Sequence, residues 1–408
     1  MKYPVWIILG SILFSSCYKE VPDLEPDVDR FDLRISGETR DFIFNSRDTA
    51  YTVEDPNLQL SFNDQLLQMD EIRVRGKNAL DYKRKSYAVF LNEPISILDR
   101  YQTSTKELRR FKLLALAMDY TYIENRVAFG ILQEAGIMPL FFKFVELRIN
   151  GETQGVYFLV EDPEQFYKEI DSEFIMRRGY NHYISDADYH PSEHFIPQET
   201  YKSQFREIYD MLPQLQGEAL LEQLGMRLNL NYYFRKMGID YLVQNGDYTD
   251  ELYLYAVVDG DRFSFRPIAW DYDDIFAPRP HEIGRAWGTG TVFGTRYYAS
   301  MEDVYDEIGQ KHIFSIEDDL DYTIARDPVL YDAYTEVLGT LMELIDQDLI
   351  EKVFRETEEE LAPFYQSISV IEQSNYDRHS TTPKLWEENL KEKKEWLIKR
   401  QSEIREEL

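Results

Sequence analysis

The stretch WDYDD, residues 270–274, constrains this chain more than any other, because it places three aspartates within four positions directly after an apolar run. Like charges this close repel one another, so they weaken the fold that holds them unless a cation or a proton offsets the charge. Aspartates are also common in loops beside strands, where they cap and turn the chain, and this ordinary structural role is the competing interpretation. The stretch therefore predicts a loop at the end of a strand, with a bound cation as one explanation of its charge.

The residues before this stretch predict a β-hairpin. LYLYAVV from residue 252 and RFSFRPIAW from residue 262 are rich in β-branched and aromatic residues, and an Asp-Gly turn lies between them. In a hairpin, the residue that enters the first strand lies beside the residue that leaves the second. Asp247 and Asp271 are therefore expected at the same edge of the hairpin, although they are 24 positions apart in the sequence.

An amphipathic helix is predicted over residues 230–244, just before this hairpin. Helix, loop with Asp247, hairpin, loop with Asp271 is the order found in the active site of protein kinases. There, one aspartate orients or deprotonates the acceptor hydroxyl, and the second binds the magnesium that bridges the nucleotide phosphates. Mg²⁺ prefers hard oxygen ligands, so a cluster of aspartates beside a bound cation is reasonable chemistry. Topology alone does not determine function, and loop aspartates in an unrelated fold remain the alternative.

The rest of the chain predicts an α+β fold with two lobes. Alternating strand patterns at 59–63, 71–76 and 86–91, one helix at 122–136 and an Asn-Gly hairpin within 142–161 indicate a β-rich N-lobe over residues 36–162. The chain then becomes mainly helical, and the C-lobe over residues 163–408 carries the hairpin with its aspartates. Two further long helices are predicted, at 328–356 and at 383–408.

The composition excludes several classes of protein. A hydrophobic fraction of 43% over 408 residues is enough for a sizeable core, so the chain is not a disordered one. The formal net charge is −30, whereas a nucleic-acid-binding protein normally has a basic face. We therefore expect no nucleic acid among its partners.

The N-terminus predicts an exported lipoprotein. Lys2 precedes a short apolar run over residues 3–14, and the small residues before Cys17 resemble a bacterial lipobox. Residues 1–17 are thus expected to be a lipoprotein signal peptide, with Cys17 as the lipidation site and residues 18–35 as an acidic tether. The lipid anchor implies the outer membrane or the cell surface, on the periplasmic or extracellular side. An ordinary signal peptide with an incidental cysteine is the alternative.

Six ordered segments resemble the CotH kinase family, which comprises secreted or surface-attached bacterial kinases with an atypical protein-kinase-like fold. VELRINGETQGVYFLVED, from residue 145, is the most specific of them. The others are RVRGKNALDYKRKSYAVFL from 73, KLLALAMDYTYIENRVAFGIL from 112, YLVQNGDYTDELYLY from 241, IAWDYDDIF from 268 and the closing LKEKKEWLIKRQSEIREEL from 390.

The resemblance implies a role for each matching residue. Asp247 matches the catalytic aspartate, Asp271 matches the metal-binding aspartate, and Asp273 is the candidate for a second metal ligand. Lys85 matches the lysine that would hold the α- and β-phosphates of ATP, although a solvated edge-strand lysine is the competing interpretation. The remaining matches are Arg75 and Gly76 beside the phosphates, Glu161 at the hinge near adenine, and Asn125 as a supporting residue behind the site.

The implied function is a kinase that uses Mg²⁺ or Mn²⁺ to transfer the γ-phosphoryl group of a nucleotide to a hydroxyl of a protein Ser/Thr or another surface acceptor. Some residues depart from the pattern. Leu252 stands five residues after Asp247, where protein kinases have a metal-binding Asn, and its neighbours are Asp250 and Glu251. Glu124 replaces the family's arginine before Asn125. The alternative is therefore a catalytically degenerate surface lipoprotein that keeps the fold and binds a cation or a partner.

Overall fold

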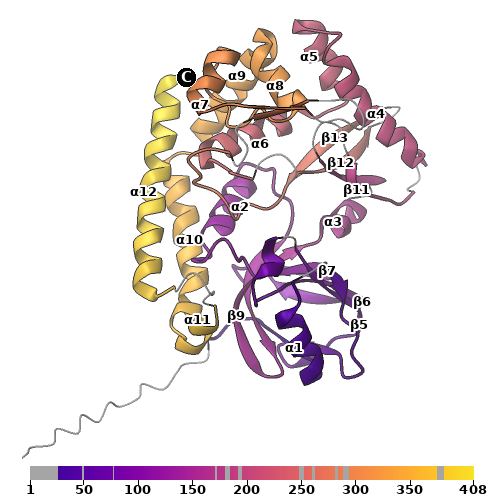
Figure 1. The fold of residues 1–408 in the computed structure, drawn as a ribbon, viewed down its shortest axis with the longest axis vertical. Coiled ribbons are helices and arrows are strands. Elements are labelled where there is room, and N and C mark those ends of the chain that lie inside the picture. The colour runs from indigo at the N-terminus through magenta and orange to yellow at the C-terminus, as the bar shows by residue number, and fades with distance from the viewer. Residues whose placement is uncertain are drawn as a thin grey trace, which may run out of the picture.

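The computed structural model describes residues 26–47, 50–76, 78–170, 172–179, 184–191, 195–247, 252–259, 262–280, 284–287, 294–374 and 381–408. The chain forms a mixed α+β fold, with a large curled sheet at one end and helices around a smaller sheet at the other (Figure 1). The predicted fold class is confirmed at this level.

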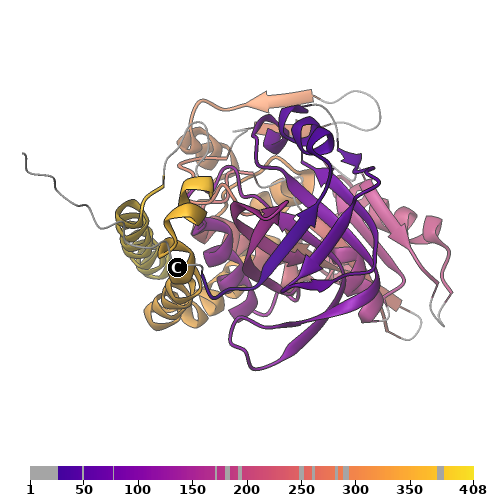
Figure 2. The same ribbon diagram turned by 90° about the horizontal axis from the view of Figure 1, so that it is seen from below.

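The large sheet has nine strands in the order β2-β5-β6-β7-β9-β8-β1-β3-β4, and its curl is visible in Figure 2. Its inner face is lined by apolar side chains of alternating strand residues, such as Val89, Phe111 and Tyr157, which form a core of their own. The strands are β1 (Arg30–Arg34), β2 (Tyr51–Thr52), β3 (Gln59–Phe62), β4 (Gln65–Leu66), β5 (Met69–Arg75), β6 (Ser86–Leu98), β7 (Thr105–Leu114), β8 (Phe142–Ile149) and β9 (Glu152–Glu161).

The first strand lies within residues 18–35, which the sequence predicted to be a tether. β1 pairs antiparallel with β3 and parallel with β8, and Phe31 and Leu33 are fully buried. The alternation of these two apolar residues with charged ones is a strand pattern, and the acidic, proline-bearing surroundings concealed it. The tether prediction is therefore wrong for residues 30–34.

Three short helical segments accompany this sheet: α1 (Gly37–Asn45), the 3-10 turn η1 (Asn78–Asp81) and α2 (Glu124–Glu134). Only α2 was expected. The first helix begins where the Ser36 side chain accepts a hydrogen bond from Thr39 N, and Ile43 is its one buried residue. A helix with a single buried residue has no apolar stripe, which is why its sequence showed no helical period.

The second sheet has four strands in the order β11-β10-β12-β13. The predicted hairpin is present as β12 and β13, paired from Leu252 with Ala269 to Asp259 with Arg262. Pro267 lies in the edge strand, the position where a residue without an N–H is tolerated. The strands are β10 (Phe174–Arg178), β11 (Ile184–Tyr189), β12 (Leu252–Asp259) and β13 (Arg262–Ala269), and a separate pair consists of β14 (Gly284–Trp287) and β15 (Gly294–Tyr297).

The remaining helices pack around this smaller sheet or, in the case of α11, against the large one. They are α3 (Pro163–Glu169), α4 (Gln198–Met211), α5 (Gly217–Gly225), α6 (Leu230–Val243), α7 (Met301–Ile308), α8 (Asp319–Arg326), α9 (Pro328–Leu344), α10 (Gln347–Tyr365), α11 (Ile368–Ser374) and α12 (Pro383–Glu407). The single helix predicted over 328–356 is two helices. The chain breaks at Ile345, and the Asp346 side chain accepts from Leu349 N to start α10.

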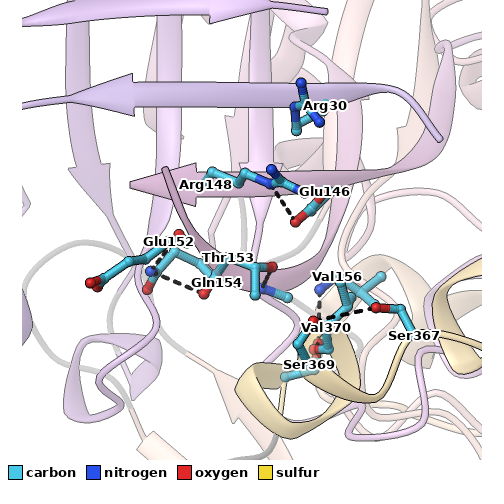
Figure 3. Close-up of polar contacts among 12 residues, drawn as sticks. Arg30, Glu146, Arg148, Glu152, Thr153, Gln154, Val156, Ser367, Ser369 and Val370 are labelled. Atoms are coloured by element: carbon cyan, nitrogen blue, oxygen red, sulfur yellow. Dashed lines mark hydrogen bonds and ion pairs between the residues drawn. The ribbon is translucent and has the colours of Figure 1, made fainter. Parts of the chain in front are cut away.

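The C-terminal helices α10 and α12 run side by side along one edge of the molecule, and α11 lies below them beside β9 (Figure 1). Helix α12 packs on α6, α9 and α10, while α11 lies against β9 in the large sheet. Figure 3 shows this α11 turn beside Val156, whose backbone N–H donates to Ser374 Oγ at 2.8 Å. In the described part of the chain, no helix combines the length and apolarity that crossing a membrane requires.

Candidate active site

Two loops that follow α6 and β13 are joined by backbone hydrogen bonds. Gly246 N donates to Asp274 O at 2.8 Å, and Phe276 N donates to Val243 O at 2.8 Å. The hairpin between them returns the chain to its starting edge, so the loop carrying Asp247 and the loop carrying Asp271 become neighbours. The structure thus brings together the two aspartates that the sequence placed at one edge.

Gly246 allows this close approach. A Cβ atom added at position 246 would overlap Asp274 Oδ2, a contact that real Cβ atoms essentially never make, and would lie 3.0 Å from the Ala277 side chain. The sequence signal, Asn-Gly-Asp at 245–247, was visible, but only the fold reveals that the glycine faces the second aspartate loop.

The backbone of the second loop is held from two sides. Asp271 has a φ of 54°, a left-handed conformation that few non-glycine residues adopt. The next residue, Tyr272, donates from its N–H to Asn125 Oδ1 at 3.0 Å and from its hydroxyl to Asp240 Oδ1 at 2.6 Å. Asp240 is paired with Lys236 at 2.7 Å, and all of these supporting side chains are buried. Asn125 therefore lies where a supporting residue was expected.

Five carboxylates gather at these loops, and we call them the acidic cluster: Asp119, Glu124, Asp247, Asp271 and Asp273. Burial raises the pKa of Asp273 well above its usual value, and the charges of the other four members raise it further. Repulsion among carboxylates that raises a pKa in this way is typical of functional sites, where a bound cation or a proton offsets the negative charge.

The start of α2 contributes two members of the cluster. The carboxylate of Asp119 accepts from the backbone N–H groups of Ile123, Glu124 and Asn125 and so caps the helix. Burial raises the pKa of Asp119 to about 6 and that of Glu124 to about 8, while Lys393 from α12 opposes both shifts. The sequence suggests Asp119 as a cap for this helix, and that role is confirmed, but it gives no sign that Asp119 belongs to the cluster.

The chemistry of the cluster fits a divalent cation, since carboxylate oxygens are the hard ligands that Mg²⁺ and Mn²⁺ prefer. Within the described residues, no three acidic, histidine or cysteine side chains are gathered closely enough to hold a metal ion as they stand. Asp271 and Asp273 are the members of the cluster that would hold such a cation.

Three predicted nucleotide-binding residues lie around the turn between β5 and β6. The Arg75 guanidinium lies 5.8 Å from the Trp270 ring centroid, directly beside the second aspartate loop. Gly76 has a φ of 127°, which favours glycine. Lys85 is buried and donates to Leu80 O, and burial lowers its pKa, with Arg47 and Asp81 as its charged neighbours. These neighbours lie outside the acidic cluster.

A second lysine lies closer to the aspartate loops. Lys112 in β7 is buried, and its Nζ atom lies 4.3 Å from the Trp270 ring centroid and 3.6 Å from Asp162 Oδ2. Burial lowers its pKa, and the charges of Arg75 and Arg177 lower it further. Sequence reasoning missed this lysine, because in the strand pattern it resembles any half-exposed basic residue.

The predicted hinge residue Glu161 is fully buried at the end of β9. It pairs with Lys106 at 2.7 Å and accepts from Phe141 N at 3.0 Å. Its side chain is thus engaged inside the β-rich part of the molecule. Cys17, Asp250 and Glu251 lie outside the described residues.

Comparison with known proteins accords with this arrangement. A model of the family described as CotH kinase protein matches residues 72–404, most of the chain. The chain belongs to the CotH kinase family. The match covers both aspartate loops, the strand with Lys112 and the C-terminal helix. The CotH resemblance read from the motifs is therefore confirmed.

One curated relative is the inner spore coat protein H of Bacillus subtilis (strain 168). It is 25% identical over 108 residues, which make up 26% of this chain and 27% of that protein. The aligned part thus spans about a quarter of the relative.

Proposed function

We propose that this CotH-family protein is a metal-dependent kinase that transfers the γ-phosphoryl group of a nucleotide to a hydroxyl group. The observation that carries the proposal is the hydrogen bonding between the Asp247 loop and the Asp271 loop, with Asp273 close enough to feel the charges of both aspartates. Protein kinases use two aspartates from loops on either side of a hairpin in this way.

The order of elements supports a kinase-like arrangement of two lobes. In protein kinases, a hairpin with a glycine-containing turn is followed by a strand with the phosphate-binding lysine, then by a helix, and then by two strands that lead to the hinge. In this chain the corresponding elements are the β5–β6 hairpin, β7, α2 and the β8–β9 hairpin. By this correspondence, the phosphate-binding lysine is Lys112 in β7, and we propose it in place of Lys85.

The proposed chemistry follows from the side chains of the site. The hydroxyl oxygen of the acceptor forms a bond to the γ-phosphorus as the bond from that phosphorus to the β,γ-bridging oxygen breaks, and the hydroxyl proton passes to Asp247. Arg75 and Lys112 orient the phosphates and balance their charge. A divalent cation, held by Asp271 and Asp273 when bound, would neutralise phosphate charge. Most of the catalytic effect would come from positioning and charge stabilisation.

The alternative is a degenerate binding module, favoured by Leu252 at the position where protein kinases have a metal-binding Asn. Incubation of the purified protein with γ-labelled ATP and Mg²⁺ or Mn²⁺ separates the two. If the protein is a kinase, labelled phosphate should appear on the protein itself or on an added acceptor that contains Ser or Thr. A well-folded protein whose melting temperature rises with Mn²⁺ alone, but which transfers no label, would favour the binding module.

We also propose that the protein acts outside the inner membrane as a lipoprotein anchored through Cys17. The relative's name describes a protein of the spore coat, which is itself a surface structure. The acceptor would then be another surface component.

A further inference from the structure

The C-terminal helix α12 places a lysine beside the acidic cluster. Lys393 Nζ lies 2.7 Å from Glu124 Oε1, and both side chains are largely shielded from water. The same ammonium group lies 4.4 Å from the ring centroid of Phe276, in the loop after Asp271. Phe276 in turn packs edge-on against Trp396, one turn further along α12, at 5.1 Å. One side chain of α12 therefore touches both elements that carry the cluster.

The charge of Lys393 acts directly on the cluster. It lowers the pKa of both Asp119 and Glu124, against the effect of burial. In protein kinases, the acidic residue of the corresponding helix pairs with the phosphate-binding lysine of the neighbouring strand. Here Glu124 pairs with a lysine from the far end of the chain, and Lys112 pairs with Asp162.

We propose that Lys393 is a positioning residue of the catalytic site, whose charge balances Glu124 and Asp119 and whose side chain clamps α2 and the loop after Asp271 onto α12. This inference rests on the proposed function, because it assumes that a divalent metal binds at the Asp271 loop. The inference extends that function, because α12, through Lys393, would set the net charge around the metal.

Removal of Lys393 should have two opposite effects, tighter binding of the metal and slower turnover. Without the Lys393 charge, the cluster is more negative, so a divalent cation should bind more tightly. Without the clamp, the start of α2 and the Asp271 loop are less well held, so turnover should fall. A residue that only stabilised the fold would weaken metal binding or leave it unchanged when removed.

The test is a charge series measured with Mn²⁺ alone, by titration calorimetry and by the fluorescence of the tryptophans, on the full chain. At a pH above the Glu124 pKa of about 8, where this carboxylate is charged, we expect Lys393→Met to lower the Kd for Mn²⁺ by about threefold or more. Under the same conditions Glu124→Gln should raise the Kd by a similar factor, and the double variant should return it close to wild type. Lys393→Arg keeps the charge and should stay within about twofold of wild type. Lys391→Met is the matched control, because it removes the same charge from an exposed position of α12.

Turnover with labelled ATP completes the test. We expect Lys393→Met to lose about tenfold or more in kcat, with KM for the nucleotide nearly unchanged. If wild type binds Mn²⁺ but Lys393→Met binds it with equal or lower affinity, the inference is overturned while the proposed kinase stands. If wild type binds no divalent metal, both are overturned. The double variant removes the Lys393–Glu124 ion pair as a whole, so it supplies the comparison if Lys393→Met does not fold.

Discussion

Asp271 has a left-handed backbone conformation, and its carboxylate lies near other carboxylates. Each of these features alone lowers the stability of the fold. Aspartate tolerates this backbone region better than most residues, yet such conformations persist mainly where their surroundings hold them. Here Tyr272 provides that hold, through its bonds to Asn125 and Asp240. A strained residue supported from both sides is typical of a functional position.

The two aspartates are expected to respond differently to loss of charge. Asp247→Asn should keep metal and nucleotide binding but lower turnover by about 10² to 10⁴, because it removes the group that takes the proton. Asp271→Asn should lower metal affinity and turnover together. Calorimetry with Mn²⁺ and labelled ATP transfer measure both quantities. Asp64→Asn, on an exposed turn of the large sheet, is the control. Equal activity of Asp247→Asn and wild type would show that another group accepts the proton.

The assignment of the phosphate-binding lysine is decided by a pair of variants. Lys112→Met should weaken binding of Mg-ATP by about tenfold or more, because a buried cation beside Trp270 would no longer meet the phosphates. Lys85→Met should leave nucleotide affinity near wild type, since Lys85 donates to Leu80 O within the β-rich part. Titration calorimetry with a non-hydrolysable ATP analogue measures both. The opposite result would restore Lys85 as the phosphate ligand.

At the scale of elements, the site depends on how closely two loops approach. The β12–β13 hairpin brings the loops to one edge, and Gly246 lets the first loop donate to Asp274 O. The register of the hairpin matters because a shift of one residue would turn each strand residue to the other face. The aspartates are thus positioned by a short local structure, and α2 and α12 then hold it.

Gly246→Ala should disrupt this approach. We expect a loss of about 1–3 kcal/mol in the free energy of unfolding and a larger relative loss of activity, since the added Cβ would displace Asp274. Urea unfolding and labelled ATP transfer measure the two effects. Gly339→Ala in α9 is the control, because nothing lies within 4 Å of its added Cβ and alanine favours a helix. An unchanged Gly246→Ala protein would mean that the loops separate in solution.

At the scale of the whole molecule, the C-terminal helices connect the two ends. Glu360 in α10 accepts from Phe144 N of β8 and pairs with Arg126 of α2 at 2.6 Å. Arg84 and Tyr122 both donate to Ser374 O at the end of α11. These contacts join the large sheet, α2 and the C-terminal helices, so motion of the sheet relative to the aspartate loops is restrained by more than the hinge.

The contact between α11 and β9 can be broken at Gly155. Its φ is 87°, and an added Cβ would lie 2.8 Å from the backbone N and Cα of Ser374, which cannot move as a side chain can. We expect Gly155→Ala to cost about 3 kcal/mol or more in the free energy of unfolding. Gly151→Ala is a matched control, because its φ is 82° but nothing lies within 4 Å. It should cost only about 1–2 kcal/mol of backbone strain. Equal losses in urea unfolding would show that α11 does not dock there.

Anchoring is the remaining property of the whole chain. Cys17→Ala should turn a membrane-associated protein into one that is released or unprocessed, because the acyl chains would provide the anchor. Detergent-phase partitioning of cell fractions measures this. If the variant partitions as the wild type does, Cys17 is not the lipidation site.

Local sequence patterns determined the two hairpins, α2, α6 and α12, and they determined that Asp247 and Asp271 lie at one edge. These features depend on short-range turn chemistry and on helical or strand periods, which a single sequence displays. The family was also accessible from sequence, because ordered motifs survive where the overall identity is low. The strand β1 and the helix α1 were missed, since the first pairs with partners far along the chain and the second has almost no apolar face.

Only the tertiary structure decided which distant side chains meet at the site. The strand order places β7, rather than the start of β6, at the position of a kinase lysine strand, and this changed the proposed phosphate ligand from Lys85 to Lys112. Packing of α12 against α6 and α10, which both contact α2, brought Lys393 to Glu124, 269 positions away. Such pairs depend on how whole elements pack, because burial of their apolar faces, and not any local pattern, sets the distance between their charges.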